Sequence, residues 1–392
     1  MLIFKFRPFN FLLIAFGFYQ LLVVNGDPLI NVNALVPCFR TVCYHEIGCI
    51  TPFISAMIIL LPPLIMCPDS PSEVNVTYHV MTPKVKKSQF GTLKDLKPQT
   101  NLAFYAHGCF ASYADKLTLA VGLALFHKYK QVVMVDWTRG ANPRQFGKIS
   151  IPLINIFLCA ANSEVVGRLT ANAMNYAIKE KRIDPSQIFF GGHSAGSHAT
   201  AFAGQYLKER YGFTMGETVA LDSSTAPFAL SNKIMPGKGD ALVVTRVLST
   251  FNFPIPVLSD LRAIAFQLGY PFPTADTDIF LNVPYYFQDQ LICNGFPMCS
   301  HFFATLALVG SLRNCLFEAQ PCISNPLAPA TTSFTGIRSS VFGRRGAICL
   351  RTPLNPLKGC ECCSTKSRLN YDNDNKTSAC PGHDPEFAKY YR

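Results

Sequence analysis

Charged residues are scarce in this sequence. Asp, Glu, Lys and Arg make up only 15% of its 392 residues, whereas hydrophobic residues make up 49%. A composition this apolar excludes a disordered chain and leaves ample side chains for a large buried core. The sequence also lacks internal repeats and low-complexity tracts, and its length fits one large domain or two to three ordinary ones.

Basic residues exceed acidic ones, but the chain has no basic helix and no alternation of basic with aromatic residues. We therefore expect no nucleic-acid partner. The formal net charge is +11, and it falls to +9 when Lys5 and Arg7 are removed with the N-terminal segment. Such a charge favours docking on anionic lipid, at a peripheral membrane or lipoprotein surface, or simply supports solubility.

The N-terminus has the features of a secretory signal. Two basic residues precede the apolar run 11–24, and Val24-Asn25-Gly26 offers a cleavage site before Asp27. The alternative is an N-terminal membrane anchor, but the run is shorter than the ~20 residues that a span needs. We expect residues 1–26 to be a signal peptide and the protein to be secreted.

Cysteines are absent from most of the middle of the chain. Of the fifteen, only Cys109 and Cys159 lie between Cys67 and Cys293. Together with a signal peptide, this number indicates disulfides, and the odd total leaves at least one thiol free or paired with another chain. The alternative is a metal cluster at Cys360, Cys362 and Cys363, but no histidine lies at ligand spacing, so we expect no metal.

Four short apolar runs each end at a residue type that can do chemistry. A run this short and uniformly apolar is typical of a parallel strand buried on both faces. A helical pattern of apolar residues lies between the second and third runs, so the sequence predicts an α/β fold with a mostly parallel central sheet flanked by helices. The runs are 102–106 before His107, 132–135 before Asp136, 188–190 before the glycine-serine segment, and 218–221 before Asp222.

The segment Gly192-His193-Ser194-Ala195-Gly196 fits the G-x-S-x-G nucleophile elbow. A strand that turns sharply into a helix needs glycines on both sides of the serine, because side chains there would collide. The bare pattern also occurs by chance in glycine-rich turns. An apolar strand before it and an alanine-rich helix after it favour the elbow.

A serine nucleophile needs a base and an acid. In α/β-hydrolases the acid follows the serine along the chain, and the histidine base follows the acid. Only His301 and His383 follow Asp222, and His301, beside Cys299, is the predicted base. Asp222 is the predicted acid because it directly ends a strand. The open alternatives for the acid are Asp240, Asp260, Asp276, Asp278 and Asp289. His198, one helical turn beyond Ser194, is predicted to be a packing residue.

The oxyanion of an acyl-transfer reaction needs two backbone donors. One is the N–H of Ala195, which follows the nucleophile. The second comes from a loop after an earlier strand, where His107-Gly108 is followed by Cys109, and the N–H of Cys109 is the predicted donor. The alternative for His107-Gly108 is an ordinary turn at the end of a strand.

These motifs, in this order, resemble the pancreatic lipase family of α/β-hydrolases over roughly residues 41–325. The matching segments are Val42-Cys43-Tyr44 to Gly48-Cys49, His107-Gly108, Val135-Asp136-Trp137 to Gly140-Ala141, the elbow, Leu221-Asp222 and Cys299-Ser300-His301. The chain departs from the family in having Ala195 for Leu, Ser197 for Ala, Cys109 for Phe and Ser223 for Pro. The three catalytic positions match.

The resemblance implies the disulfides Cys43–Cys49, Cys293–Cys299 and Cys315–Cys322. In the family, a disulfide before the catalytic histidine closes the lid, and here it would enclose only residues 294–298. Short lids are typical of phospholipases A1 and broad esterases. The resemblance thus implies a cofactor-free carboxylic-ester hydrolase that acts on lipid; the alternatives are a triacylglycerol lipase and a non-catalytic lipid-binding or storage protein.

Two segments follow the expected signal peptide. Residues 27–345 form the hydrolase domain, and residues 346–392 form a cysteine-rich C-terminal extension, too short for a lipid-binding β-sandwich of ~100 residues. Asn75 and Asn375 begin sequons and are candidate glycosylation sites.

Overall fold

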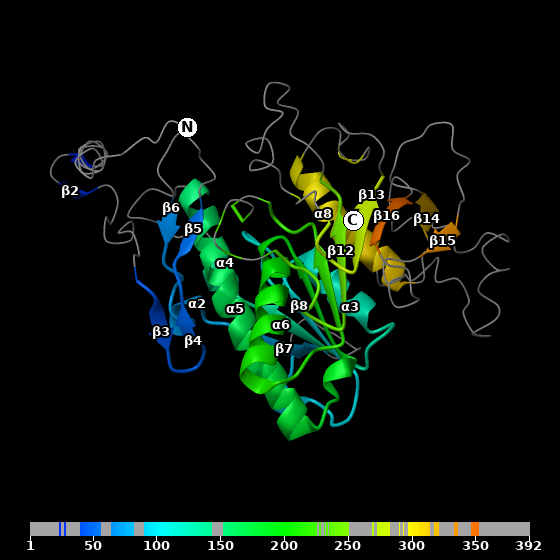
Figure 1. Ribbon diagram of the computed structural model, residues 1–392, viewed down its shortest axis with the longest axis horizontal. Coiled ribbons are helices and arrows are strands. Elements are labelled where there is room, and N and C mark those ends of the chain that lie inside the picture. The colour runs from blue at the N-terminus through cyan, green and yellow to red at the C-terminus, as the bar shows by residue number, and fades with distance from the viewer. Residues whose placement is uncertain are drawn as a thin grey trace, which may run out of the picture.

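A ten-stranded sheet forms the centre of the molecule (Figure 1). The computed structural model describes residues 23–24, 27–28, 40–55, 64–81, 90–142, 152–225, 227–228, 231, 233, 235–250, 269, 273–282, 290, 293, 297–313, 317–320, 333–335 and 346–352. Within these residues, the strands of the sheet lie in the order β15 (Ser333–Thr335), β14 (Phe317–Gln320), β16 (Gly346–Arg351), β13 (Thr277–Leu281), β12 (Val243–Leu248), β11 (Glu217–Leu221), β10 (Ile188–His193), β8 (Leu102–Ala106), β9 (Gln131–Asp136) and β7 (Thr77–Met81).

Seven neighbouring strands of this sheet, from β16 to β9, run parallel to one another. Three outer strands are antiparallel: β7 pairs with β9, and β14 pairs with both β15 and β16. All four apolar runs in the sequence form strands of the parallel part. The predicted fold class, a mostly parallel sheet flanked by helices, is therefore confirmed.

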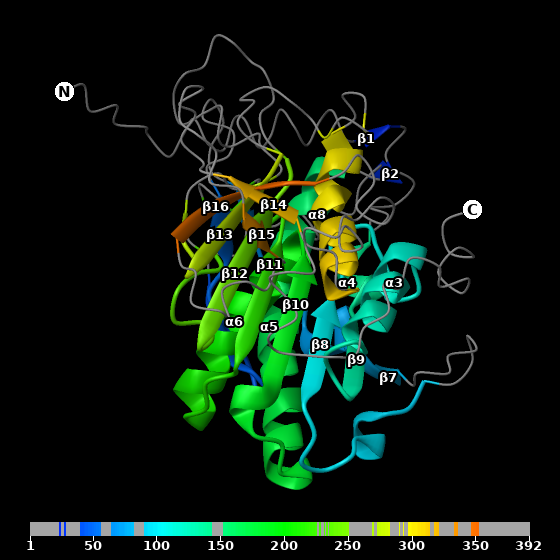
Figure 2. The same cartoon turned by 90° about the vertical axis from the view of Figure 1, so that its right-hand side faces the viewer.

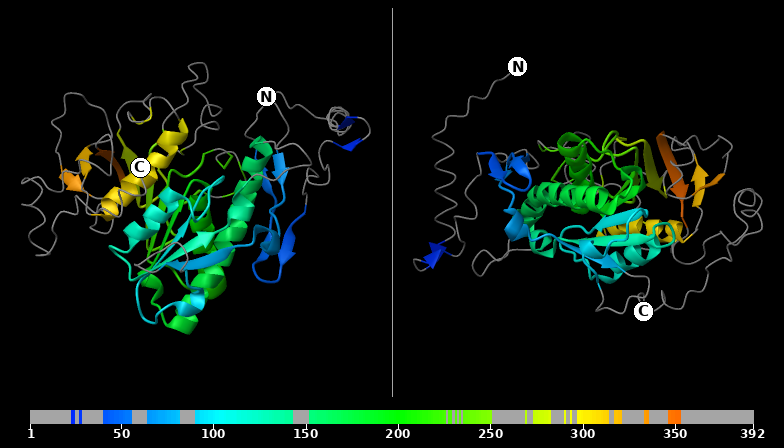
Figure 3. Two further views of the ribbon diagram at one scale, coloured as in Figure 1. Left: turned by 180° about the vertical axis from the view of Figure 1, so that it is seen from behind. Right: turned by 90° about the horizontal axis from the view of Figure 1, so that it is seen from below.

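Helices cover both faces of the sheet. The helices α5 (Pro152–Lys181) and α6 (Ala195–Tyr211) pack on one face, and α3 (Lys116–Leu125) and α8 (Pro297–Leu312) pack on the other. The view from below in Figure 3 shows the two helical layers with the sheet between them, and Figure 2 shows α8 and α3 in front of the strands. A hydrophobic core therefore lies under each helical layer, and a smaller third cluster of described residues forms around Phe53, Phe157 and Phe228.

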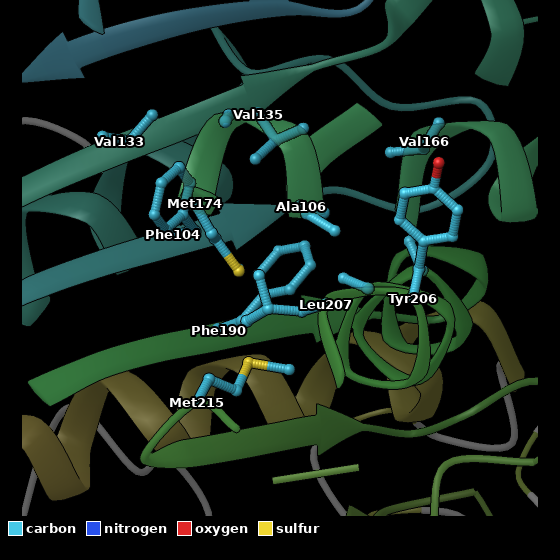
Figure 4. Close-up of a cluster of buried hydrophobic side chains, with 14 of the residues drawn as sticks. Phe104, Ala106, Val133, Val135, Val166, Met174, Phe190, Tyr206, Leu207 and Met215 are labelled. Carbon is cyan, nitrogen blue, oxygen red and sulfur yellow. The ribbon is translucent and has the colours of Figure 1, made fainter. Parts of the chain in front are cut away.

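The alternation of side chains along β8 explains why its sequence is uniformly apolar. Phe104 belongs to the core under α5 and α6, whereas Ala103 and Tyr105 belong to the core under α3 and α8. Figure 4 shows Phe104 near Phe190, its partner in β10, with Met174 of α5 and Leu207 of α6 close to them. A strand buried on both faces has no position for a polar residue.

Smaller elements surround this framework. The hairpin of β3 and β4 lies against α5. Arg168 of α5 holds it there, since its guanidinium donates hydrogen bonds of 2.9 Å to the carbonyl oxygens of Ile47 and Cys49. Among the described residues, no helix combines the length and apolarity that crossing a membrane requires. The small elements are β1 (Val23–Val24), β2 (Asp27–Pro28), β3 (Val42–Tyr44), β4 (Gly48–Ile50), β5 (Phe53–Ser55), β6 (Leu64–Met66), α2 (Pro71–Val74), η2 (Leu93–Asp95), α4 (Thr138–Ala141) and η3 (Pro185–Gln187).

The sheet continues past the predicted end of the domain at residue 345. Strand β16 pairs in parallel with β13, and its Cys349 and Leu350 are buried. Residues 347–350, Ala-Ile-Cys-Leu, form one more short apolar run of the kind that marks a buried strand.

Candidate active site

Ser194 lies in the sharp turn between β10 and α6, at the carboxyl edge of the parallel strands. Its backbone has φ 56° and ψ −123°, a strained conformation for a residue with a side chain. A Cβ atom on Gly192 would lie 2.2 Å from the carbonyl oxygen of Gly196, and one on Gly196 would lie 2.3 Å from that of His107. Only glycine fits at either position, so the turn has the close approach of backbones that an elbow requires.

Asp222 and His301 contact each other across 79 residues of sequence. The Nδ1 atom of His301 lies 2.6 Å from Oδ2 of Asp222, and both side chains are buried. Asp222 directly follows β11, the neighbour of β10, and His301 lies near the start of α8. Because the carboxylate can only accept, Nδ1 carries the proton and the neutral ring has its acceptor at Nε2.

Two residues that the sequence analysis missed hold the Asp222 carboxylate. Its Oδ1 accepts the backbone N–H of Ser249 at 2.8 Å and of Thr250 at 3.1 Å, and the Thr250 hydroxyl donates to Oδ2. The Ser249 hydroxyl also donates to the carbonyl oxygen of Ser300, at 2.7 Å, which ties α8 to the same edge. The sequence signal that could have identified Ser249 and Thr250 is their position directly after β12, at the carboxyl edge of the sheet.

The Ser194 hydroxyl makes its hydrogen bond with Ser224. The two Oγ atoms are 2.9 Å apart, and both residues are buried. Among the described residues, the structure gives no hydrogen bond between Ser194 and His301. The three predicted residues thus share one edge of the sheet, with Asp222 and His301 in direct contact and the Ser194 hydroxyl turned toward Ser224.

His193 connects the elbow to the helix of the predicted base. Its Nε2–H donates a hydrogen bond of 2.9 Å to the carbonyl oxygen of His301, and its ring centroid is 4.6 Å from that of His301 and 4.9 Å from that of Phe302. Burial, and then the Coulombic interaction with His301, lowers the pKa of His193 to about 3. The ring is therefore neutral at ordinary pH and acts as a fixed hydrogen-bond donor.

The loop after β8 packs directly against Ser194. A Cβ atom on Gly108 would lie 2.9 Å from Cβ of Ser194. Trp137 holds the loop by donating its indole N–H to the carbonyl oxygen of His107 at 2.9 Å and its backbone N–H to Nε2 of His107 at 3.3 Å. Burial alone would raise the pKa of Asp136, but its contacts with His107 and His79 and its hydrogen bonds from Thr138 lower it, so this carboxylate stays charged beside the loop.

The two predicted oxyanion donors lie in this region. Among the described residues, the structure gives the N–H of Cys109 no hydrogen-bond acceptor. Ala195 is the first residue of α6, and the first N–H groups of a helix have no partner within the helix. Both groups are thus available, with the dipole of α6 favouring negative charge at its N-terminus.

A disulfide that the sequence analysis did not pair fixes the Cys109 loop. Cys109 is bonded to Cys159 in α5, 50 residues away. The next residue, Phe110, donates its N–H to the carbonyl oxygen of Ala141 at 2.8 Å. The loop that carries the predicted oxyanion donor is thus held covalently and by hydrogen bonds.

Three of the other acids considered from the sequence, Asp240, Asp276 and Asp278, lie away from this edge. Asp240 accepts hydrogen bonds from Gly237 and Gln205 in the turn before β12, and its burial raises its pKa to about 6. Asp276 accepts the N–H of Val244 at the start of β12, and Asp278 pairs with the buried Arg246 at 3.0 Å. Asp260, Asp289 and His383 lie outside the described residues.

The remaining predicted residues have mixed outcomes. The disulfides Cys43–Cys49 and Cys293–Cys299 are both present. Asn75 is exposed and ends α2 with a left-handed backbone, φ 52°. Glycosylation at Asn75 stays a prediction. Outside the described residues lie Cys315, Cys322, Asn375 and the cysteines Cys360, Cys362 and Cys363.

Comparison with known sequences finds phospholipases A1. The chain is 27% identical over 167 residues to phospholipase A1 VesT1.02 of Vespa tropica, which covers 40% of this chain and 55% of that protein. It is 26% identical over 172 residues to phospholipase A1 of Vespa basalis, covering 41% and 56%. The chain spans about half the length of the curated relatives it matches. No protein-family model matches the chain.

Comparison with solved structures finds matches of low similarity. Est1E from Butyrivibrio proteoclasticus is 14% identical, with a TM-score of 0.24 over 38% of this chain and 46% of that one. An α/β serine hydrolase without a lid from Xanthomonas campestris is 12% identical, with a TM-score of 0.26 over 44% and 64%. In its matched part, then, the chain is similar to phospholipases A1 of Vespa species, in agreement with its resemblance to the pancreatic lipase family.

Proposed function

We propose that the protein is a serine carboxylic-ester hydrolase that acts on lipids. The observation that carries the proposal is the buried contact of 2.6 Å between His301 Nδ1 and Asp222 Oδ2, at the edge of the sheet where the Ser194 elbow lies. Serine, acid and base follow in the chain order of α/β-hydrolases. The names of the phospholipase A1 relatives support the same class of reaction.

In the proposed mechanism, Ser194 is the nucleophile. Its hydroxyl turns to His301, whose Nε2 takes the proton while Oγ attacks the acyl carbon of the ester. The carbonyl oxygen becomes an oxyanion that accepts hydrogen bonds from the N–H groups of Cys109 and Ala195. His301 then gives the proton to the leaving alkoxide, and the alcohol departs from the acyl-enzyme.

A water molecule completes the cycle. His301 takes one of its protons as the water oxygen attacks the acyl-enzyme, and the same proton returns to Ser194 Oγ when the fatty acid leaves. Asp222 stays ionised throughout. It orients the His301 ring and stabilises the imidazolium that forms twice in each turnover.

We propose phospholipid as the substrate, with cleavage of the phospholipase A1 type. The names of the relatives and the short Cys293–Cys299 loop support this choice over triglyceride. The net positive charge supports docking at an anionic lipid surface. The disulfides of the structure support secretion, because disulfides persist in oxidising compartments.

Fatty-acid release from phospholipid vesicles tests the proposal. We expect the wild-type protein to release the acyl chain of position 1 from phosphatidylcholine vesicles, faster when anionic lipid is added, and Ser194→Ala to release none above background. Triolein emulsion is the parallel substrate. A preference for triolein would replace phospholipase by triacylglycerol lipase, and no release from either substrate would reject the hydrolase.

A further inference from the structure

Ser224 lies in contact with the atom that the proposed mechanism uses as nucleophile. Its Oγ is 2.9 Å from Oγ of Ser194, and the exposed fractions of the two residues are only 7% and 8%. Neither the motif nor the acid-base pair includes Ser224, which follows Asp222 by two positions. A hydroxyl this close to the nucleophile in a buried site must affect its reactivity.

The position of Ser224 is fixed from the side opposite Ser194. The buried His198 donates its Nε2–H to the carbonyl oxygen of Ser224 at 3.0 Å, and its ring stacks on Phe228 with centroids 3.4 Å apart. The backbone of Ser224 also forms an isolated antiparallel bridge with Gly269. His198, predicted only to pack, therefore holds the segment that presents the Ser224 hydroxyl to the nucleophile.

Either direction of the Ser194–Ser224 hydrogen bond lowers the reactivity of Ser194. If Ser194 donates, its only proton points to Ser224 and away from Nε2 of His301. If Ser224 donates, the bond occupies a lone pair of the oxygen that must attack the ester. The bond therefore stabilises the orientation of the Ser194 hydroxyl toward Ser224, and not the orientation in which Ser194 attacks the ester.

We propose that Ser224 is a further residue of the catalytic site, which holds the Ser194 hydroxyl in a resting orientation until an ester displaces it. The inference rests on the proposed function, since it needs Ser194 to be the nucleophile. If Ser194 is the donor, its bond to Ser224 breaks before His301 can accept the proton of Ser194; if Ser224 is the donor, the bond breaks as the lone pair of Ser194 Oγ turns to the ester. The cost of breaking it is part of the barrier to acylation, and removal of the Ser224 hydroxyl lowers that barrier.

The chain offers matched controls beside Ser224. Ser223 is 1% exposed and Thr225 is fully buried, and neither hydroxyl has a hydrogen-bond partner among the described residues. Ser223→Ala and Thr225→Val therefore remove a neighbouring buried hydroxyl without touching Ser194. Ser224→Cys is a second variant of the same position, with a thiol that hydrogen-bonds more weakly than a hydroxyl.

The test is the rate at which a fluorophosphonate probe labels Ser194 in the full-length protein. We expect Ser224→Ala to be labelled about fivefold faster than wild type, the factor that corresponds to a net hydrogen bond of about 1 kcal/mol. Ser224→Cys should show a smaller increase, and Ser223→Ala and Thr225→Val should match wild type. Thermal unfolding of each variant verifies its fold.

Two failures are distinguishable. If wild type is labelled but a folded Ser224→Ala and a folded Ser224→Cys are labelled at the same rate or more slowly, the role of Ser224 is rejected and the proposed function stands. The same holds if Ser223→Ala accelerates labelling equally. If neither wild type nor Ser224→Ala reacts at Ser194, the proposed function fails, and the role of Ser224 fails with it.

Discussion

The imidazole of His193 donates a hydrogen bond of 2.9 Å to the carbonyl oxygen of His301, 108 residues further along the chain. This bond joins the elbow to the helix of the proposed base. We expect His193→Phe, which keeps a ring beside Phe302 but loses the donor, to lower kcat about fivefold, since one net hydrogen bond is worth about 1 kcal/mol. Steady-state kinetics on a soluble short-chain ester measure this effect; an unchanged kcat would contradict it.

The pH dependence of the same variant separates positioning from proton transfer. The pKa of His193 is lowered to about 3, first by burial and then by the Coulombic interaction with His301, so His193 stays neutral above pH 4. The acid limb of the kcat/KM profile above pH 4 should therefore have the same midpoint in wild type and His193→Phe. A shifted midpoint would mean that His193 itself titrates in the reaction.

The Asp222→Asn variant tests the acid. Its amide can still accept from Ser249, but it can also donate to Nδ1 of His301 and so favour the ring tautomer whose Nε2 is protonated. We expect kcat to fall by about 10³ to 10⁴, with the melting temperature little changed. Asp276→Asn is the matched control, because Asp276 lies at the opposite end of β12. Equal activity of the two variants would exclude Asp222 as the acid.

The Cys109–Cys159 disulfide should matter for both stability and rate. It closes a loop of 50 residues, whereas Cys43–Cys49 closes one of 6. The chain-entropy relation predicts that replacing both cysteines by alanine costs about 4 kcal/mol for the first pair and about 2 kcal/mol for the second. Denaturant unfolding measures the two values.

Only the first replacement should lower kcat, because it frees the loop that carries the N–H of Cys109. We expect a loss of about tenfold, less than the ~10² to 10³ that loss of an oxyanion donor costs. If Cys43→Ala/Cys49→Ala lowers kcat equally, the effect comes from general destabilisation and the role of the tether is excluded.

Asp240 gives the protein a pH-dependent stability. Burial raises its pKa to about 6, so the folded chain binds this proton more tightly than the unfolded chain, where the pKa is about 3.9. The stabilisation from the bound proton is present at pH 4 and is lost as the pH rises to about 6. Asp240→Asn should resemble wild type at pH 4 and exceed its free energy of unfolding by up to about 3 kcal/mol at pH 7. Urea unfolding at both pH values tests this; a difference independent of pH would contradict it.

The sequence predicted the parts of the fold that depend on local patterns. The four apolar runs became parallel strands because burial on both faces imposes a composition that is visible locally. The predicted positions of Ser194, Asp222 and His301 at one edge follow from the same strands, since parallel strands carry their carboxyl ends together. Strand β16 was missed because a single apolar run beyond the predicted boundary had no motif beside it.

Contacts between distant segments could not be predicted from the sequence. The bond between His193 and His301 and the pairing of Cys109 with Cys159 depend on how α8 and α5 pack on the sheet. Cysteine spacing alone does not determine connectivity. The hydrogen bond between Ser194 and Ser224 depends on side-chain orientation, which no pattern of residue types encodes.

Mass spectrometry of the protein quenched in acid during turnover tests the central claim most directly. With a short-chain p-nitrophenyl ester as substrate, we predict that the peptide containing Ser194 gains the mass of the acyl group, and that Ser194→Ala gains none. Turnover with no acyl group on Ser194, or with the acyl group on another residue, would contradict the assignment of Ser194 as the nucleophile.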